Sequence, residues 1–275
     1  MSQSVGNPHR VLGTMVRFYR ERAGLSRAEV ARRICKSVSL LQAIELGDRS
    51  ATDQVAADLD TALDTGGALA ELREEMRNGL GYLVFPAWFQ EWAQKEAEAT
   101  TLRWFEPLVV PGLLQTEDYA RAIFRTELMI SDEEIEEQVG ARMKRQDVLT
   151  RSKPPMAWVI IDEWVVRRKI GGRHVMGEQL GRLVETARQP NVVIQVIPAS
   201  VGAHRGLESG FAIADFADGP SVGYREGAGG GHMVEDSDGL RVLDRIWDTL
   251  RGDTLSRAAS LSLLEEAAAS WAAAA

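Results

Sequence analysis

The sequence of 275 residues contains one cysteine, four histidines and no long apolar segment. The single cysteine, Cys35, excludes a disulfide within the chain and any site that needs several thiolates. The histidines stand far apart, without the spacing of metal ligands, so we expect neither a bound metal nor a cofactor. No run approaches the roughly 18 apolar residues of a membrane helix, and the first residues show no secretory signal pattern. The absence of a membrane helix and of a signal segment predicts a cytoplasmic protein.

The composition is that of an ordinary globular protein, with 45% hydrophobic and 26% charged residues, and the length suits two domains. The charge is divided unevenly along the chain. Residues 1–52 carry nine Lys or Arg against four Asp or Glu, a net charge of +5; because the whole chain carries −8, residues 53–275 carry −13. A basic first segment on an acidic remainder is typical of a protein that binds nucleic acid through that segment alone.

Apolar residues at helical spacing dominate the first 77 residues. Gly24 ends a first helix, and Ser26 with Glu29 forms a capping box at the start of a second. The second and third helices, joined by a tight turn, are typical of a helix-turn-helix unit, whose helix starts approach the major groove of DNA. The expected helices cover residues 11–23, 26–34, 37–46, 52–63 and 68–77.

Residues 78–86 lack a sustained period and predict a linker between domains at 8–77 and 87–271. Short β-rich runs at 156–161 and 192–197 predict buried strands, and 211–216 with 221–225 a strand pair. The sequence therefore predicts an all-α five-helix domain followed by an α+β domain. The helices expected in the second domain cover residues 88–99, 117–127, 132–150, 176–188, 237–250 and 255–270.

Residues 10–60 resemble the Cro/repressor-type (XRE) helix-turn-helix domain. In that family an arginine near the end of the first helix pairs with a glutamate that closes the third, and the matching residues are Arg20 and Glu45. A structural role is favoured for this pair, and any single basic residue nearby can instead be a solvated surface charge. The DNA contacts that the resemblance and the charge pattern imply are Arg17, Arg20, Arg27, Lys36, Ser37, Val38, Ser39, Gln42, Ala43 and Arg49.

The residues that match base-facing positions have small side chains. They allow only modest direct readout, in which a valine contacts a thymine methyl group. Specificity is therefore expected to depend on Arg27, Lys36 and DNA shape, with Arg17 and Arg49 at phosphates. The base-facing residues are Ser37, Val38, Ser39 and Ala43.

Cys35 occupies the turn position where the XRE family often has glycine, because a turn residue commonly takes a positive φ. Two interpretations stay open for this side chain. The favoured one is a turn residue packed partly into the core. The alternative is an oxidant-sensing thiol, activated by Lys36 and the nearby helix start.

Residues 109–122, Val-Val-Pro-Gly-Leu-Leu-Gln-Thr-Glu-Asp-Tyr-Ala-Arg-Ala, strongly resemble the signature of the WhiJ-like regulators of actinobacteria. The carboxy-terminal domain of these regulators follows an XRE head, and matching residues continue as far as Gly210-Phe211. The resemblance implies a transcriptional regulator, often paired with a small protein encoded nearby in an antitoxin-like arrangement. It supplies no known ligand.

Two arginines of the second domain are candidate ligand or partner contacts. Arg142 and Arg145 are one turn apart on the helix that starts near residue 132, so both are expected to face Glu163 or Glu226. Such a cluster either binds an anionic ligand or ties the helix to the sheet, and the tie is favoured.

The remaining candidates are His204 and Tyr224. His204 lies in a loop after a strand, where catalytic groups often occur, but no nucleophile, phosphate-loop or metal motif accompanies it. We therefore predict no catalytic residue and no enzyme. Tyr224 is expected to line a small-molecule pocket together with Trp158 and Phe211 if these side chains converge.

The leading hypothesis is a sequence-specific DNA-binding transcriptional regulator that binds a double-stranded palindromic operator as a homodimer. Dimerisation follows because one small head makes too few contacts for specific control. The second domain would then supply dimer contacts and receive a signal or partner. Two alternatives remain: an antitoxin-like module that binds a small partner protein and regulates its own gene, and a regulator that responds to a small-molecule effector.

Overall fold

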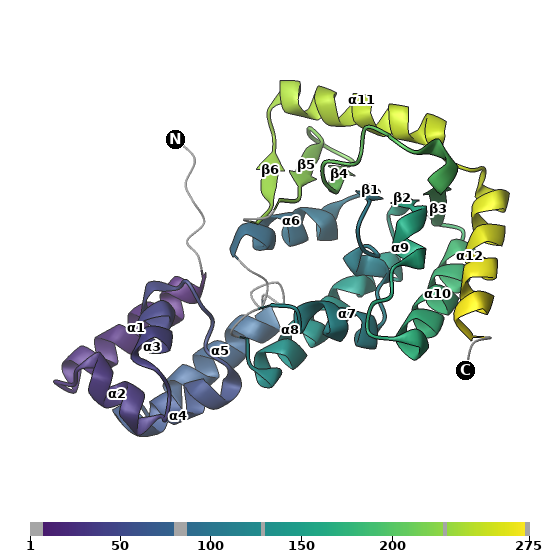
Figure 1. Ribbon diagram of the computed structural model, residues 1–275. Helices are drawn as coiled ribbons and strands as arrows, with labels where there is room; N and C mark the ends of the chain where they lie inside the picture. Colours follow the sequence, from purple (N-terminus) through teal and green to yellow (C-terminus); the bar gives the residue numbers. More distant parts are fainter. Residues whose placement is uncertain (1–7, 80–86, 128–129, 228–229, 273–275) are drawn as a thin grey trace. The chain divides into compact units, whose positions relative to one another are not determined.

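The computed structural model describes residues 8–79, 87–127, 130–227 and 230–272. The chain divides into two compact units, residues 1–87 and 88–275, which we call the head and the body (Figure 1). Each is described by itself. Within the described residues, no helix is both long and apolar enough to cross a membrane.

The head is helical; its second helix begins at the predicted capping box, whereas its first begins at Pro8, three residues before the expected start. The Ser26–Glu29 capping box is present, and Thr52 caps a later helix through a hydrogen bond to the Val55 amide. The apolar faces of the helices meet in one core that includes Val16, Val30 and Leu41. The helices are α1 (Pro8–Arg22), α2 (Arg27–Arg33), α3 (Val38–Leu46), α4 (Asp53–Leu63) and α5 (Ala68–Gly79).

Helix α5 corrects the start of the predicted linker. It continues through Asn78 and Gly79, two residues that disfavour a helix interior but are tolerated in its last turn. The rest of the predicted linker, residues 80–86, lies outside the described residues.

The body is built on a six-stranded mixed sheet with strand order β3-β2-β1-β4-β5-β6 (Figure 1). Strands β1, β2 and β3 are parallel, whereas β4, β5 and β6 continue the sheet in antiparallel pairs. Phe105 near the end of β1 pairs with Phe211 at the start of β4, and Phe211 pairs with Arg225 at the end of β5. The ends of β1, β2, β3 and β5 and the starts of β4 and β6 therefore lie at the same edge of the sheet. The strands are β1 (Thr101–Glu106), β2 (Met156–Asp162), β3 (Val192–Ile197), β4 (Phe211–Asp215), β5 (Val222–Arg225) and β6 (His232–Val234).

Helices cover both faces of this sheet. Side chains such as Trp104 and Ile161 pack with α6, α7, α10 and α12 on one face, whereas Phe105 and Ile160 pack with Trp247 of α11 on the other. The body is therefore an α+β layer structure whose carboxyl edge, where β1, β2 and β3 end, is reached by loops from both faces. The helices are α6 (Ala87–Glu98), α7 (Glu117–Phe124), α8 (Asp132–Arg145), α9 (Glu163–Arg167), α10 (Arg173–Ala187), α11 (Ser237–Asp253) and α12 (Arg257–Ala272).

Three elements of the body escaped the sequence analysis. The sequence of β1 contains the charged residues Arg103 and Glu106, so it shows no continuous apolar run. Strand β6 and helix α9 are too short to show a period. The predicted helix at 132–150 is shorter than expected, because α8 ends at Arg145 and a 3₁₀ turn covers Gln146–Leu149.

Candidate nucleic-acid interface

Helix α3 presents a polar face that the fold leaves open. The Ser37 hydroxyl accepts the Leu40 amide at 3.1 Å and starts the helix, and Gly47 ends it with φ 74°. Leu41 and Ile44 are buried against the other head helices. The opposite face exposes Val38, Ser39 and Gln42, and Val38 is 45% exposed although it is apolar.

The turn before α3 has the backbone that the sequence predicts. Cys35 has φ 53°, the Cys35 amide bonds the Arg32 carbonyl at 3.3 Å, and the Lys36 amide bonds the Ala31 carbonyl at 2.9 Å. These bonds form a Schellman motif, in which a left-handed residue ends the helix. The favoured interpretation of the side chain was wrong: Cys35 is exposed, because backbone hydrogen bonds rather than packing of the thiol end this helix.

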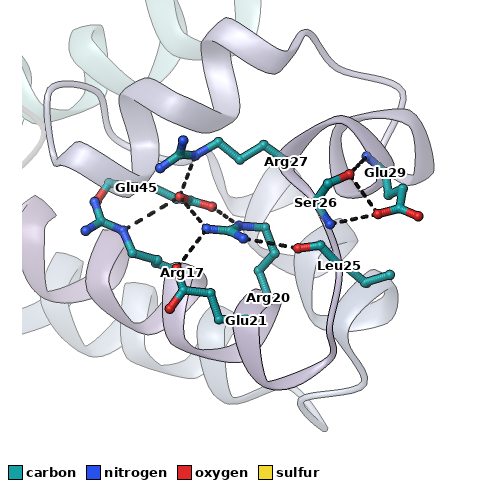
Figure 2. Close-up of polar contacts among 8 residues, drawn as sticks. All are labelled: Arg17, Arg20, Glu21, Leu25, Ser26, Arg27, Glu29 and Glu45. Atoms are coloured by element: carbon teal, nitrogen blue, oxygen red, sulfur yellow. Dashed lines mark hydrogen bonds and ion pairs between the residues drawn. The ribbon is translucent and has the colours of Figure 1, made fainter.

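Glu45, near the end of α3, is the centre of an arginine cluster. Its buried carboxylate accepts Arg20 Nε at 2.5 Å and Arg20 Nη2 at 3.1 Å, and it accepts Arg27 Nε at 2.8 Å. Arg17 donates through Nη2 to the Glu45 carbonyl oxygen at 3.0 Å, and its Nε lies 3.7 Å from the carboxylate. Figure 2 shows these three side chains converging on Glu45 from α1 and the start of α2.

The contacts within this cluster stabilise the charged forms of Glu45 and Arg20. Burial alone would raise the pKa of the Glu45 carboxyl, but hydrogen bonds from Arg20 and Arg27 outweigh it and lower that pKa. The Arg20 pKa is raised, mainly by its hydrogen bonds to Glu45. One carboxylate thus orients three guanidinium groups. Those of Arg17 and Arg27 are partly exposed, so the surplus positive charge faces solvent.

The remaining predicted DNA contacts fall into two groups. Lys36, Ser39 and Gln42 are exposed on or beside the open face of α3. Ser37 and Ala43 instead support the backbone, Ser37 as the helix cap and Ala43 as the carbonyl that accepts the amides of the turn after α3. Arg49 is half-buried in that turn.

The sequence analysis missed the ion pair between Arg27 and Glu45. It assigned Arg20 alone to this glutamate and treated Arg27 as a separate contact. Because Arg27 and Glu45 are 18 residues apart, no helical spacing relates them. The one available signal was an excess of arginine over glutamate around a position expected to be buried.

In the body, Arg142 and Arg145 do lie near each other, and Arg145 pairs with the buried carboxylate of Glu96, with Nη2 to Oε2 at 2.9 Å. Arg142 donates through Nη1 to the Gln115 side-chain oxygen at 2.6 Å, and its guanidinium lies 4.6 Å from the Phe124 ring centre. Burial, followed by the charge of Arg145, lowers the Arg142 pKa to about 10. The two arginines therefore tie helix α8 to the core.

Two carboxyl groups face these arginines from the carboxyl edge of the sheet. Glu106 ends β1 and is buried, and Glu226 follows β5. Burial raises the Glu106 pKa well above its ordinary value, and the neighbouring Glu226 carboxyl, which hydrogen-bonds it, raises it further. The prediction that the arginines face Glu226 agrees with its electrostatic effect on Arg142.

The other predicted partner, Glu163, is elsewhere, which corrects that expectation. Glu163 follows β2 and accepts the Ala199 amide at 2.9 Å and Arg167 Nη2 at 2.9 Å. Glu163 therefore holds the loop after β3 in place: α9 begins at this residue, and its carboxylate accepts a backbone amide of that loop.

His204 and Tyr224 belong to different faces of the sheet. His204 Nε2 lies 2.9 Å from Asp162 Oδ2, and its Nδ1 accepts the Gly206 amide at 3.2 Å. The imidazole therefore ties the loop after β3 to the end of β2. Tyr224 packs with α6 on one face, whereas Trp158 and Phe211 pack toward α11 on the other. The three side chains do not converge on the predicted pocket. The strand register places Trp158 in line with Gly223, next to Tyr224, and it pairs Tyr224 with Ala212, next to Phe211; successive residues of a strand point to opposite faces of the sheet. The five candidate ligand or partner contacts of the body therefore form no single site; they are Arg142, Arg145, Glu163, His204 and Tyr224.

The distinctive string at residues 109–122 is explained by packing. A Cβ atom at Gly112 would lie 3.1 Å from Arg145 Nη1 and 3.2 Å from Arg142 Cδ, so the two arginine side chains pack closely against this glycine. Gln115 donates to the Val110 carbonyl at 2.7 Å while it accepts Arg142. These contacts agree with a structural use of the string.

Comparison with known families assigns both units. Residues 89–266 match a domain of unknown function, DUF5753. The chain belongs to the DUF5753 family. In this DUF5753 protein, residues 11–72 match a helix-turn-helix domain. No curated protein and no solved structure matches the chain significantly.

The helix-turn-helix match agrees with the geometry of the head. It supports a DNA-binding regulator of transcription and favours a regulator over an enzyme. The DUF5753 match carries no activity with it.

Proposed function

We propose that this DUF5753 protein is a sequence-specific transcriptional regulator of the WhiJ-like kind, with an XRE-type head that binds a double-stranded operator. The observation that carries the proposal is the Glu45 cluster beside the open face of α3. Three guanidinium groups share one buried carboxylate there, so the head holds a positive surplus that a DNA phosphate neutralises.

Helix α3 enters the major groove with the face that it exposes. Gln42 donates and accepts at an adenine edge, and Val38 contacts a thymine methyl group. Ser39 adds a hydroxyl that bonds any base edge within reach. Ser37, whose hydroxyl caps the helix, contributes the position of α3 rather than direct readout.

The arginines of the cluster hold the phosphate backbone on either side of this helix. Arg27 uses Nε for Glu45, so its two terminal nitrogens are available to donate to phosphate oxygens. Glu45 fixes the guanidinium before DNA arrives, which lowers the entropy that ordering a long side chain costs. Lys36 and Arg49 add phosphate contacts at the two ends of α3.

The protein works as a homodimer on a palindromic site. A single head reads only a few base pairs, and two half-sites about one helical turn apart multiply the affinity. Residues 53–275 carry a net charge of −13, so phosphate repels them and leaves the heads to hold the DNA. The body supplies the dimer contacts and receives the signal, which in the antitoxin-like arrangement is a small partner protein.

Genome-wide immunoprecipitation of the tagged protein with sequencing tests the proposal. We expect a sharp palindromic motif that is lost in an Arg27→Ala/Ser39→Ala variant. The matched control is Arg245→Ala, which removes an exposed arginine from α11 of the body and leaves occupancy unchanged. Diffuse occupancy, or a motif retained in the double variant, would contradict specific reading by the head.

A further inference from the structure

Three large apolar side chains of the body are exposed to solvent. Leu108 is 57% exposed, Trp164 61% and Leu207 59%. In the described part of the body only Val242 on α11, at 38%, is also large, apolar and exposed. Scattered exposed apolar residues need no explanation, but three of comparable exposure in segments that follow neighbouring strands do.

These three residues lie at the carboxyl edge of the sheet. Leu108 lies in the loop after β1 and Trp164 in α9, which directly follows β2. Because the parallel register pairs Glu106 with Ile161, these two segments leave the sheet side by side. Leu207 lies in the loop after β3. Neighbouring strands of a sheet are about 4.8 Å apart, so the three loops start within about 10 Å of one another.

The loop of Leu207 is fastened to the other two strands. His204 Nε2 lies 2.9 Å from Asp162 Oδ2 at the end of β2, and its ring packs on Phe105 of β1 with centroids 5.9 Å apart. Gly206 lies so close to Phe105 that a Cβ atom there would be 2.2 Å from the ring. We call Leu108, Trp164 and Leu207 the carboxyl-edge surface. These contacts hold the loop of Leu207 in place before any partner binds.

The charges around this surface are opposite in sign to those of the body as a whole. Residues 88–275 carry 21 Lys or Arg and 29 Asp or Glu, a net charge of −8. The loops after β2 and β3 instead expose more positive than negative charge, and no described carboxylate pairs with Arg168 or Lys169. The charged side chains of these two loops are Arg167, Arg168, Lys169 and Arg205 against Glu163 and Glu208, a surplus of two positive charges.

We infer that the carboxyl-edge surface docks an acidic polypeptide that places a large apolar side chain beside Trp164. The inference rests on the partner role proposed above and names the surface and the chemistry of that partner. Apolar burial supplies the affinity, and the basic rim selects an acidic partner and speeds the encounter.

Charge excludes the other occupants. The head segment 1–52 carries +5 and is repelled by a basic rim. A symmetric contact with a second copy would place the same basic rims against each other. Nucleic acid is disfavoured because the body carries a net charge of −8, which repels phosphate.

Selection of a random peptide library displayed on phage against the full chain tests this inference. We expect enriched peptides that combine Trp, Phe or Leu with Asp or Glu. As synthetic peptides followed by fluorescence anisotropy, they should lose affinity about tenfold or more for Trp164→Ser. An Arg168→Glu/Lys169→Glu variant should lose a similar factor, and the loss should shrink at high salt. Val242→Ser is the matched control and keeps the affinity.

Several results would overturn the inference. Selected peptides without acidic residues, equal binding by Trp164→Ser and the parent, or no enrichment at all would each exclude an acidic apolar partner at this surface. Retention of the parent's thermal unfolding midpoint by Trp164→Ser shows that any loss of binding is not unfolding. A dimer in light scattering that Trp164→Ser dissociates would assign the surface to a second copy. Operator binding by the head is measured separately, so a failure of the regulator proposal can be distinguished from a failure of peptide binding at the carboxyl-edge surface.

Discussion

The head and the body each build a cluster from arginine and glutamate, but with opposite surplus. In the head a single buried carboxylate meets three guanidinium groups. In the body the guanidinium groups of Arg142 and Arg145 face three carboxyl groups. Arg145 pairs with that of Glu96, and the other two belong to Glu106 and Glu226. The pKa values follow this difference, because that of Glu45 is lowered and that of Glu106 is raised.

The comparison shows that composition alone does not tell what a charged cluster does. In the body, burial raises the pKa of Glu106 and of Glu226, while Arg142 and Arg145 tie helix α8 to the core. The head leaves positive charge uncompensated at a partly exposed face. A surplus of that kind is stabilised by an external anion, and DNA supplies one.

Glu45→Gln should have the largest effect. It leaves three guanidinium groups without their carboxylate, and breaking a buried ion pair costs roughly 3 kcal/mol of unfolding free energy. Denaturant unfolding of the head, followed by a dye on Cys35, the chain's lone cysteine, measures this loss. Glu21→Gln, which removes an exposed partner 3.3 Å from Arg20, is the control and should cost less than about 0.5 kcal/mol. Equal losses would mean that burial of Glu45 contributes nothing.

If the proposed phosphate contact of Arg17 forms, Arg17→Ala should weaken operator binding about tenfold while Arg20 still holds Glu45. The slope of log affinity against log salt should become shallower by about one. A binding titration over a range of salt concentrations measures both effects. An unchanged salt slope would show that the surplus charge of the head does not meet phosphate.

Glu106→Gln should stabilise the body at alkaline pH. Since the folded-state pKa of Glu106 lies above its ordinary value of 4.5, the folded body binds this proton more tightly than the unfolded chain. Parent stability therefore falls as pH rises from about 4.5 through the folded pKa, and the variant escapes that loss. We expect a gain on the order of 1 kcal/mol at alkaline pH and little change at pH 4.5.

Tryptophan fluorescence measures the unfolding of the body selectively, because all seven tryptophans lie between residues 88 and 271. Glu185→Gln, at an exposed position on α10, is the control and should leave the pH profile unchanged. Destabilisation of Glu106→Gln at every pH would show that the carboxyl pair is ionised and fully paired.

Cys35→Gly should have the smallest effect and leaves the charges of the head unchanged. Glycine relieves the left-handed backbone at φ 53° but adds entropy to the unfolded chain, so we expect a gain of about 0.5 kcal/mol in unfolding free energy. Circular dichroism during denaturant unfolding measures it. Asp64→Gly, at φ 55°, should gain less, because aspartate tolerates this conformation better. A loss of stability in Cys35→Gly would assign a packing role to the thiol after all.

The helices of the head could be predicted closely because their ends depend on neighbours in the sequence. Ser26 and Glu29 cap each other across three residues, and the positive φ at Cys35 follows from hydrogen bonds within one turn. The pocket of Trp158 and Tyr224 was predicted wrongly, because strand parity and sheet order, not the aromatic composition, decide which face each side chain joins.

The sequence by itself determined the helix-turn-helix head and its basic charge, since local periodicity, capping and composition carry that information. The pair of Arg20 and Glu45, 25 residues apart, could be expected only from the resemblance to the XRE family. Only the tertiary structure decided that Arg27 shares Glu45, that Glu106 meets Glu226, and that three exposed apolar residues gather at one edge of the sheet. Each of these depends on segments far apart in the chain. Their distances are set by how the apolar faces pack, and no spacing along the chain encodes that packing.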